Sequence, residues 1–448
     1  MKKLITMKIS YIKFLFIITI FICAGRGFSQ ERLTLEESVK LGLQNSKDLK
    51  ISNSKIVSSD AGIDIVNSQF LPQLKFQASY SRLSNVPDFD VLLPFLSKPI
   101  TISQTILNNY NFRLSLQQPL FTGFRLIAQR NSSKLVKQST ESDFQKDKNE
   151  AAMNIQVAFW NYYKTMEIMS VIEDNLKVTR RHIDDTKNFY NNGLATQNDV
   201  LKLEVQESNT ELMEVDAKNN IELARSSFNK TLGLPLDENT QINAVEIQRT
   251  EFPGNYTALV KEAIDNRNEL KSLDFRIEAS RENIRASRSS YFPQIFLNAN
   301  YYFNRPNQRY QPPEDKFHSS WDVGVNLSWD IWTWGNVSAQ VTQSEQNLYQ
   351  AQTQKEQLKE NIELEVNQNY LAVKYALNKL DVLEKTIDQA EENLRETSDK
   401  YNNQLATSTD LVDAENSLLT AQTNYKTALV DYQISRIKLL KAIGRKLY

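Results

Sequence analysis

Two halves of this sequence carry the same succession of motifs, and no other feature constrains the fold as strongly. The matching blocks are residues 42–50 with 263–271, 70–74 with 291–295, and 190–199 with 401–410. The first two pairs share an offset of 221 residues, as from Pro72 to Pro293, and the third pair has an offset of 211 residues, as from Tyr190 to Tyr401. Such a period indicates that each half folds into the same series of elements. We predict an internal tandem repeat.

The boundaries of the two repeats follow from the change of offset. The first half contains the longer insert, residues 86–108, between blocks that match on either side. Because it is absent from the second half, we expect this insert to be a loop. The first structural repeat then spans 30–233 and the second 256–448, with a linker at 234–255.

Each repeat begins with a helical run that a proline ends. In the first half Thr34 and Glu37 have the spacing of a capping box, before a periodic run that continues to Pro72. A comparable run extends from about residue 256 to Pro293. Proline lacks an amide hydrogen and restricts the residue before it, so both runs are expected to stop at equivalent places.

After each proline the hydrophobic period changes from 3.6 to 2, which is typical of strands with one apolar and one polar face. Strands are predicted at about 73–83, 110–120, 294–304 and 320–331. They have the length of tilted membrane-spanning strands, with Trp and Tyr near their ends. A soluble sandwich would show the same alternation, so both alternatives stay open at this point. Four strands cannot close a barrel around a channel, and a membrane location therefore requires several copies to share one barrel.

Two very long helical tracts follow Gly123 and Gly335. In the second tract an apolar residue recurs at every seventh position, at Val366, Val373, Leu380, Ile387, Leu394 and Tyr401. The first tract repeats this coiled-coil pattern 211 residues earlier. Each tract of roughly 65 residues would extend about 100 Å at 1.5 Å per residue. We predict long antiparallel hairpins with tips near 190–199 and 401–410, and hence a fold that is mainly α with a small β part.

The composition disfavours several classes of function. Lys and Arg (53) balance Asp and Glu (54), so no basic field attracts nucleic acid. The two histidines, His182 and His318, lack the neighbours of a zinc site or a catalytic triad. The sequence contains no Walker A loop, nucleophile elbow or glycine-rich nucleotide fingerprint. We therefore predict no catalytic residues, no metal site, no cofactor and no enzyme activity, with a carboxylate-based hydrolase as a remote alternative.

The N-terminus has the features of a secretory signal peptide. Four lysines precede the apolar stretch 14–24, and small residues follow it, so we predict a signal peptide at 1–29. A lipoprotein anchored through Cys23 is the alternative, although the bulky Ile22 precedes that cysteine. Downstream of this segment no apolar run approaches the ~18 residues that a membrane-spanning helix requires.

A hydroxyl and an acid stand three residues apart in each hairpin tip. These pairs are Thr196 with Asp199 and Thr407 with Asp410. The structural interpretation is a pair of helix N-caps, with each carboxylate favoured by the helix dipole. The functional interpretation places the pairs at the free end of a coiled coil, where they could surround an opening or meet a partner. The two interpretations are compatible.

Taken together, the chain resembles the TolC-like outer-membrane efflux protein family. The residues that carry the resemblance are the opening 33–37, the Leu-Pro-Gln and Phe-Pro-Gln triplets at 71–73 and 292–294, Pro119-Leu120-Phe121-Thr122-Gly123, and the two tip motifs. The resemblance implies a homotrimer in the outer membrane that contacts lipid through a shared transmembrane β-barrel, with four strands per protomer. It also implies an α-helical barrel across the periplasm, and it assigns the linker to an equatorial segment.

The resemblance also implies partners and site residues. The function would be an exit duct of a tripartite efflux pump or a type I secretion system, joined to an inner-membrane pump through a periplasmic adaptor, also called a membrane fusion protein. The docking tips map to Gly193, Leu194, Ala195, Leu405 and Ala406. The periplasmic constriction maps to Asp410 and Asp413, with Asp199 as the first-repeat counterpart of Asp410. The sequence departs from the family pattern at Gln404, where glycine is common, and at Ala406, where some members have arginine.

The alternative function, from a different class, is a periplasmic or surface coiled-coil scaffold or adhesin that forms no pore. Heat-modifiable migration and conductance in planar bilayers would distinguish it from an exit duct.

Overall fold

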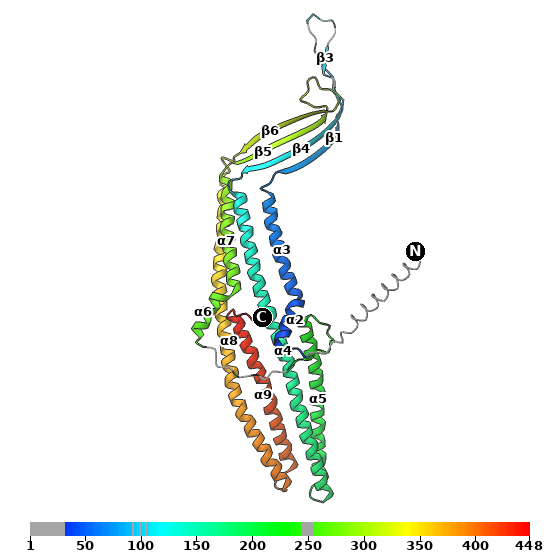
Figure 1. Cartoon of the computed structure of the whole chain (residues 1–448), viewed down its shortest axis with the longest axis vertical. Helices are drawn as coiled ribbons and strands as arrows, with labels where there is room; N and C mark the ends of the chain where they lie inside the picture. The colour runs from blue at the N-terminus through cyan, green and yellow to red at the C-terminus, as the bar shows by residue number, and fades with distance from the viewer. Residues whose placement is uncertain are drawn as a thin grey trace, which may run out of the picture. The chain divides into compact units, whose positions relative to one another are not determined.

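The computed structural model describes residues 32–448 except 92–93, 96, 98–99, 104, 244–246, 248 and 250–253. The predicted signal peptide and Cys23 lie outside the described residues, as does part of the linker. The elements of the first half are α2 (Leu35–Asn45), α3 (Lys47–Ser68), β1 (Gln73–Arg82), β2 (Phe89–Val91), β3 (Ile100–Ser103), β4 (Asn108–Phe121), α4 (Arg125–Asn191) and α5 (Gln197–Leu232) (Figure 1). Those of the second half are α6 (Tyr256–Asn266), α7 (Asn268–Arg288), the 3-10 turn η1 (Ser289–Tyr291), β5 (Gln294–Arg305), β6 (His318–Ser328), α8 (Asn336–Asn402) and α9 (Ser408–Ala442). The predicted fold class, mainly α with a four-stranded β part in a tandem repeat, is confirmed.

The four strands from the two repeats form one antiparallel sheet in the order β1-β4-β5-β6. The central junction joins the repeats, because β4 pairs with β5 with Leu114 opposite Tyr301. The strands β1 and β6 are the two edges of this sheet. The insert 86–108 differs from the predicted loop, because it contains β2 and β3 as a separate two-stranded sheet. Its alternation is too short to distinguish a strand from a loop in the sequence.

The two faces of the sheet differ in polarity, as the period of 2 predicts. One face carries large apolar side chains that are exposed in the single chain: Leu74, Phe76, Trp321, Val323, Val325 and Leu327. The other face carries polar side chains, among which Arg113 donates to the Oδ1 atom of Asn300 through Nη2 at 2.8 Å. A soluble monomer rarely exposes a contiguous apolar face of this kind.

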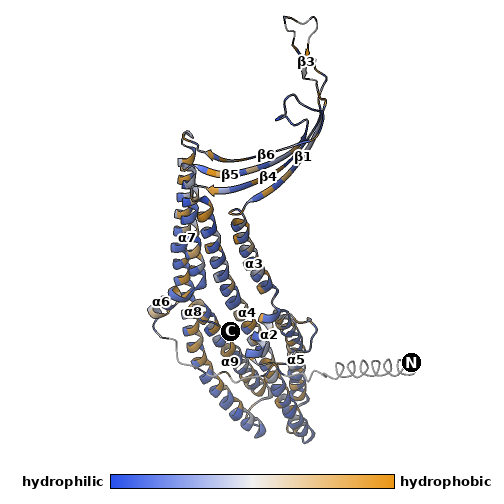
Figure 2. Cartoon of the chain, turned by 45° about the horizontal axis from the view of Figure 1, so that its top comes forward, coloured by the Kyte–Doolittle hydropathy of each residue, from blue (hydrophilic) through white to orange (hydrophobic). Residues whose placement is uncertain are grey.

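Among the helices in the described part of the chain, none combines the length and the hydrophobicity needed to cross a membrane. Figure 2 shows hydrophilic and hydrophobic residues mixed along each of the long helices.

The initial helical runs are interrupted, and the prediction of one continuous helix in each half was wrong. The first run breaks at Ser46 and the second at Arg267, which are equivalent positions of the repeat. Ser46 leaves the helical region with φ −52° and ψ 120°, and its hydroxyl accepts a hydrogen bond from the amide of Leu49 at 3.2 Å. Serine competes with the helical hydrogen bonds in this way, so it ends α2 and caps α3.

By Cα proximity the chain forms two compact units, and these do not coincide with the two repeats. One unit comprises the described residues within 32–49, 147–266 and 363–448, and the other those within 50–146 and 267–362. Each unit therefore takes segments from both repeats. The repeats at 30–233 and 256–448 were predicted from matching sequence motifs, and their boundaries stay a prediction. The two units are instead defined by which segments pack together.

The first unit has its core where α2, α4, α5 and α9 meet. Phe159 and Phe228 are fully buried and pack edge to face with their ring centroids 5.9 Å apart. Gly42 of α2 lies so close to α4 that an added Cβ would be 2.5 Å from the side chain of Ile155.

Candidate functional site at the hairpin turns

The turn between α4 and α5 is built by a glycine in the left-handed conformation. Gly193 has φ +74°, and its amide donates to the carbonyl of Tyr190 at 2.9 Å. The amide of Leu194 donates to the carbonyl of Phe189 at 2.8 Å. These two bonds form a Schellman motif, which satisfies the last carbonyls of α4 and reverses the chain.

The turn between α8 and α9 has the same geometry without glycine. Gln404 has φ +63°, and its amide donates to the carbonyl of Tyr401 at 2.9 Å. The amide of Leu405 donates to the carbonyl of Lys400 at 2.7 Å. An L-residue in this region is strained by its Cβ atom, so the second turn is held together less favourably than the first.

Both returning helices begin with a reciprocal capping box. The hydroxyl of Thr196 accepts from the amide of Asp199 at 3.3 Å, and the Asp199 carboxylate accepts from the amide of Thr196 at 2.9 Å. Thr407 and Asp410 repeat this arrangement at 3.2 and 2.8 Å. The two threonines therefore act as helix caps, and the acids stabilise the helix starts as predicted for this spacing.

The acids in the two caps differ in their remaining contacts. The Oδ1 atom of Asp199 accepts from the hydroxyl of the buried Ser408 at 2.6 Å, which links the two turns. Hydrogen bonds from Ser408 and Thr196 lower the pKa of Asp199 below its ordinary value. Asp410 is exposed, and hydrogen bonds from Thr407 lower its pKa. Both carboxylates therefore stay charged at neutral pH, with Asp199 partly exposed and Asp410 exposed.

A pocket of about 220 Å³ lies between the two turns. It is lined by Phe189, Leu194, Ala195, Asp199, Tyr401, Gln404, Ala406, Thr407 and Ser408. Leu194 and Leu405 are 54% and 79% exposed, and Gly193 is also exposed. Asp413 lies one turn of α9 beyond Asp410 and is exposed as well. All the residues proposed from the sequence for docking and constriction are thus gathered at or beside the two turns.

A buried ionisable cluster lies further along the same helices, and the sequence reasoning missed it. Glu415 of α9 is fully buried, accepts from the hydroxyl of Thr179 at 3.0 Å, and has its Oε1 atom 3.6 Å from Nε2 of His182. Burial raises the pKa of Glu415 to about 7 and lowers that of His182. The only sequence signal is that Glu415 flanks the apolar stripe of α9. Its first-repeat counterpart, Glu204, is instead half-exposed and paired with Lys187.

Within the described ranges, no group of three or more His, Cys, Asp or Glu residues is arranged to hold a metal ion. The acids at the turns are engaged in caps or face solvent.

The model of the outer membrane efflux protein family matches residues 39–234 and 259–445. The outer membrane protein TolC of Escherichia coli is 23% identical over 420 residues, which cover 90% of this chain and 82% of TolC. The alkaline protease secretion protein AprF of Pseudomonas aeruginosa is 22% identical over 341 residues, covering 72% and 67%. The solved MtrE outer membrane channel of Neisseria gonorrhoeae superposes with a TM-score of 0.71 at 17% identity, covering 92% and 89%.

The family match and these relatives identify the protein class as an exit duct of the outer membrane, with a helical part in the periplasm. The chain belongs to the outer membrane efflux protein family, whose model matches most of its length. It serves as a duct for efflux or type I secretion, and members of this family are channels rather than enzymes.

Proposed function

We propose that three copies of the chain form one conduit, in which each copy contributes four strands to a shared barrel and two hairpins to a helical barrel. The observation that carries this proposal is the sheet itself. Its apolar face is exposed in the single chain, and β1 and β6 have one unpaired edge each. Joining β6 of one copy to β1 of the next would satisfy both edges.

The test is the mass and conductance of the purified protein in detergent. We expect light scattering to give three times the mass of the mature chain, and planar bilayers to show discrete conductance steps. A monomer that stays soluble without detergent and carries no current would refute the proposal.

We further propose that the two turns dock a periplasmic adaptor of an inner-membrane pump. Leu194 and Leu405 supply exposed apolar contacts beside the small residues Gly193, Ala195 and Ala406. The test compares Leu194→Asp and Leu405→Asp with Leu212→Asp, because Leu212 lies in the middle of α5 and its exposure of 65% falls between theirs. The yield of the product crosslinked to the adaptor in cells should fall in the first two variants only. Equal crosslinking in all three would exclude docking at the turns.

Finally, we propose that Asp410 and Asp413 form the acidic constriction at the periplasmic end, with Asp199 behind them. Asp410 and Asp413 are exposed, which supports this proposal. The Asp199 carboxylate instead accepts a hydrogen bond from the Ser408 hydroxyl. Replacing Asp410 and Asp413 by alanine should reduce the preference for cations over anions in single-channel recordings. Unchanged selectivity would contradict the acidic ring. The variant Asp199→Ala serves as a comparison, with a smaller expected effect.

A further inference from the structure

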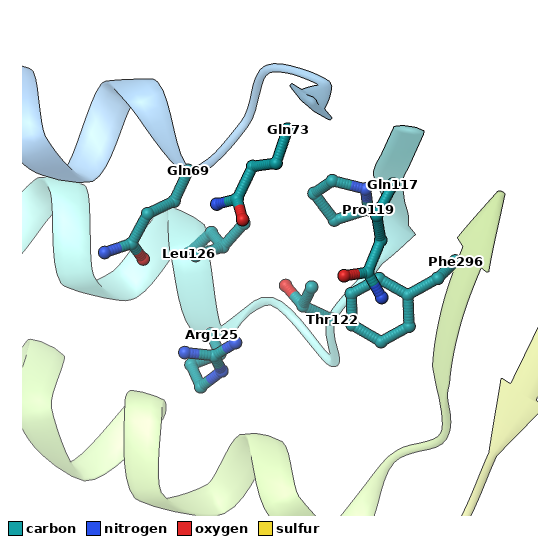
Figure 3. A pocket seen from close by; sticks show the side chains of 8 residues that line it. All are labelled: Gln69, Gln73, Gln117, Pro119, Thr122, Arg125, Leu126 and Phe296. Atoms are coloured by element: carbon teal, nitrogen blue, oxygen red, sulfur yellow. The ribbon is translucent and has the colours of Figure 1, made fainter. Parts of the chain in front are cut away.

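A second pocket lies at the end of the sheet where the strands meet the helices. It has a volume of about 210 Å³ and is lined by Gln69, Gln73, Gln117, Pro119, Thr122, Arg125, Leu126 and Phe296 (Figure 3). These side chains come from the turn after α3, from β1, β4 and β5, from the turn between β4 and α4, and from the start of α4, all within one compact unit. Nothing in the proposed docking or constriction uses this pocket.

The strand register shows which face of the sheet the pocket opens on. Gln73 lies opposite Gln117 in the β1–β4 pair, and Pro119 lies opposite Phe296 in the β4–β5 pair. Gln73 and Gln117 alternate with the apolar residues Leu74 and Leu116, so they project from the polar face. In the conduit proposed above, the polar face lines the bore. The inference that follows rests on that proposed function.

The lining combines hydrogen-bond donors with an apolar wall. Among the described residues, the Arg125 guanidinium has no carboxylate within ion-pair distance, and the amides of Gln69 and Gln73 have no hydrogen-bond partner. Arginine offers five donors in a planar fork, which matches phosphate and carboxylate groups. Pro119, Leu126 and Phe296 supply the apolar contacts.

Two features hold this lining in place. The side-chain amide of Gln118 donates to the carbonyls of Phe70 and Pro119, each at 2.9 Å, and so ties β4 to the end of α3. Gly123 has φ +60° and lies so close to Ser289 that an added Cβ would be 2.4 Å from its carbonyl oxygen. The turn between β4 and α4, which presents Thr122 and Arg125, is therefore tightly fixed.

We infer that this pocket binds small anionic amphiphiles, molecules with a phosphate or carboxylate head and a short apolar body, as they pass along the bore. The head lies against Arg125 and the glutamine amides, and the apolar body lies against Phe296. The volume of about 210 Å³ leaves room for a head group with part of its apolar body. The pocket thereby gives the duct a preferred substrate class.

Phenyl phosphate is the probe, because it joins an anionic head to one ring. Isothermal titration calorimetry on the purified protein in a nonionic detergent should show binding that inorganic phosphate and benzyl alcohol do not reproduce. Arg125→Gln should weaken it at least tenfold, and Phe296→Ala should reduce the affinity for phenyl phosphate towards that for inorganic phosphate. The matched control is Arg113→Gln, because that guanidinium lies on the same face but is already bonded to Asn300.

Single-channel recording provides the second measurement. Phenyl phosphate should interrupt the current, with dwell times shortened at least tenfold in Arg125→Gln and unchanged in Arg113→Gln. Equal binding by wild type and Arg125→Gln, or an equal loss in Arg113→Gln, would overturn the inference. Because calorimetry does not require conductance, a silent channel that still binds phenyl phosphate through Arg125 would refute the conduit and leave this site standing.

Discussion

At the scale of single residues, the two hairpin turns differ most at the position that needs a left-handed backbone. Gly193 meets this need without strain, whereas Gln404 adopts φ +63° with a side chain. We predict that Gln404→Gly stabilises the protein by about 1 kcal/mol. Thermal unfolding in detergent should show a higher midpoint for Gln404→Gly and a lower one for Gly193→Gln. An added Cβ at Gly193 meets no neighbouring atom within 4 Å. The lower unfolding midpoint of Gly193→Gln would therefore report backbone strain alone.

Glu415 makes stability depend on pH. Its pKa of about 7 in the folded protein exceeds the ordinary value of 4.5, so folding favours the protonated carboxyl. The stabilisation is complete below pH 4.5 and is lost as the pH rises through 7, by on the order of 3 kcal/mol at most. His182 acts in the opposite direction and offsets part of this loss, because burial lowers its pKa and stability therefore rises as the pH increases towards its ordinary value of 6.5.

The variant Glu415→Gln should abolish this dependence. We expect the unfolding midpoint of the wild type to fall between pH 5 and pH 8 by more than that of the variant. Glu204→Gln, at the equivalent and half-exposed position, is the control and should keep the wild-type slope. Parallel slopes for wild type and Glu415→Gln would show that this carboxyl does not titrate in the fold.

Local contacts could be predicted from the sequence, whereas contacts between distant residues could not. The caps at Thr196 and Thr407 follow from a local spacing, because both bonding partners lie three residues apart. Glu415 meets Thr179 across 236 residues, and no local pattern encodes that contact. The pocket around Arg125 was missed for the same reason, since its lining comes from three distant stretches of the chain, 69–73, 117–126 and residue 296.

At the scale of elements, the connection between β4 and α4 depends on Gly123. Its positive φ and the short approach to Ser289 both exclude a side chain. We predict that Gly123→Ala destabilises the protein by roughly 1–3 kcal/mol. Gly62→Ala in the middle of α3 is the matched control, because an added Cβ there has open space and helix propensity favours alanine. Equal unfolding midpoints for the two variants would rule out strain at Gly123.

Element types were predicted well because each long segment keeps one hydrophobic period. The helices α4 and α8 are 67 residues long and carry apolar heptads over 155–190 and 366–401, and most positions of the four strands alternate between apolar and polar residues. The breaks at Ser46 and Arg267 were missed because the apolar period continues across them. The small strands β2 and β3 were missed because three or four residues are too few to show a period.

At the scale of the whole molecule, the apolar face of the sheet should decide whether the protein enters the outer membrane. Val325 and Asn326 are neighbours on β6 and point to opposite faces. We predict that Val325→Asp sharply reduces the amount of heat-modifiable trimer in outer-membrane fractions, because a charge facing lipid costs up to a few kcal/mol per copy. Asn326→Asp should leave that amount unchanged. If both variants assemble equally, the apolar face does not contact lipid.

The strand order has one more consequence. At the junction of β4 with β5, the second strand of one repeat pairs with the first strand of the next. A seam between neighbouring copies, β6 against β1, would bring together the same two kinds of strand. The β4–β5 pair within one chain therefore has the same composition as the β6–β1 interface that would close the ring between copies. Because each chain holds two repeats, the ring would need half as many subunits as one built from single repeats.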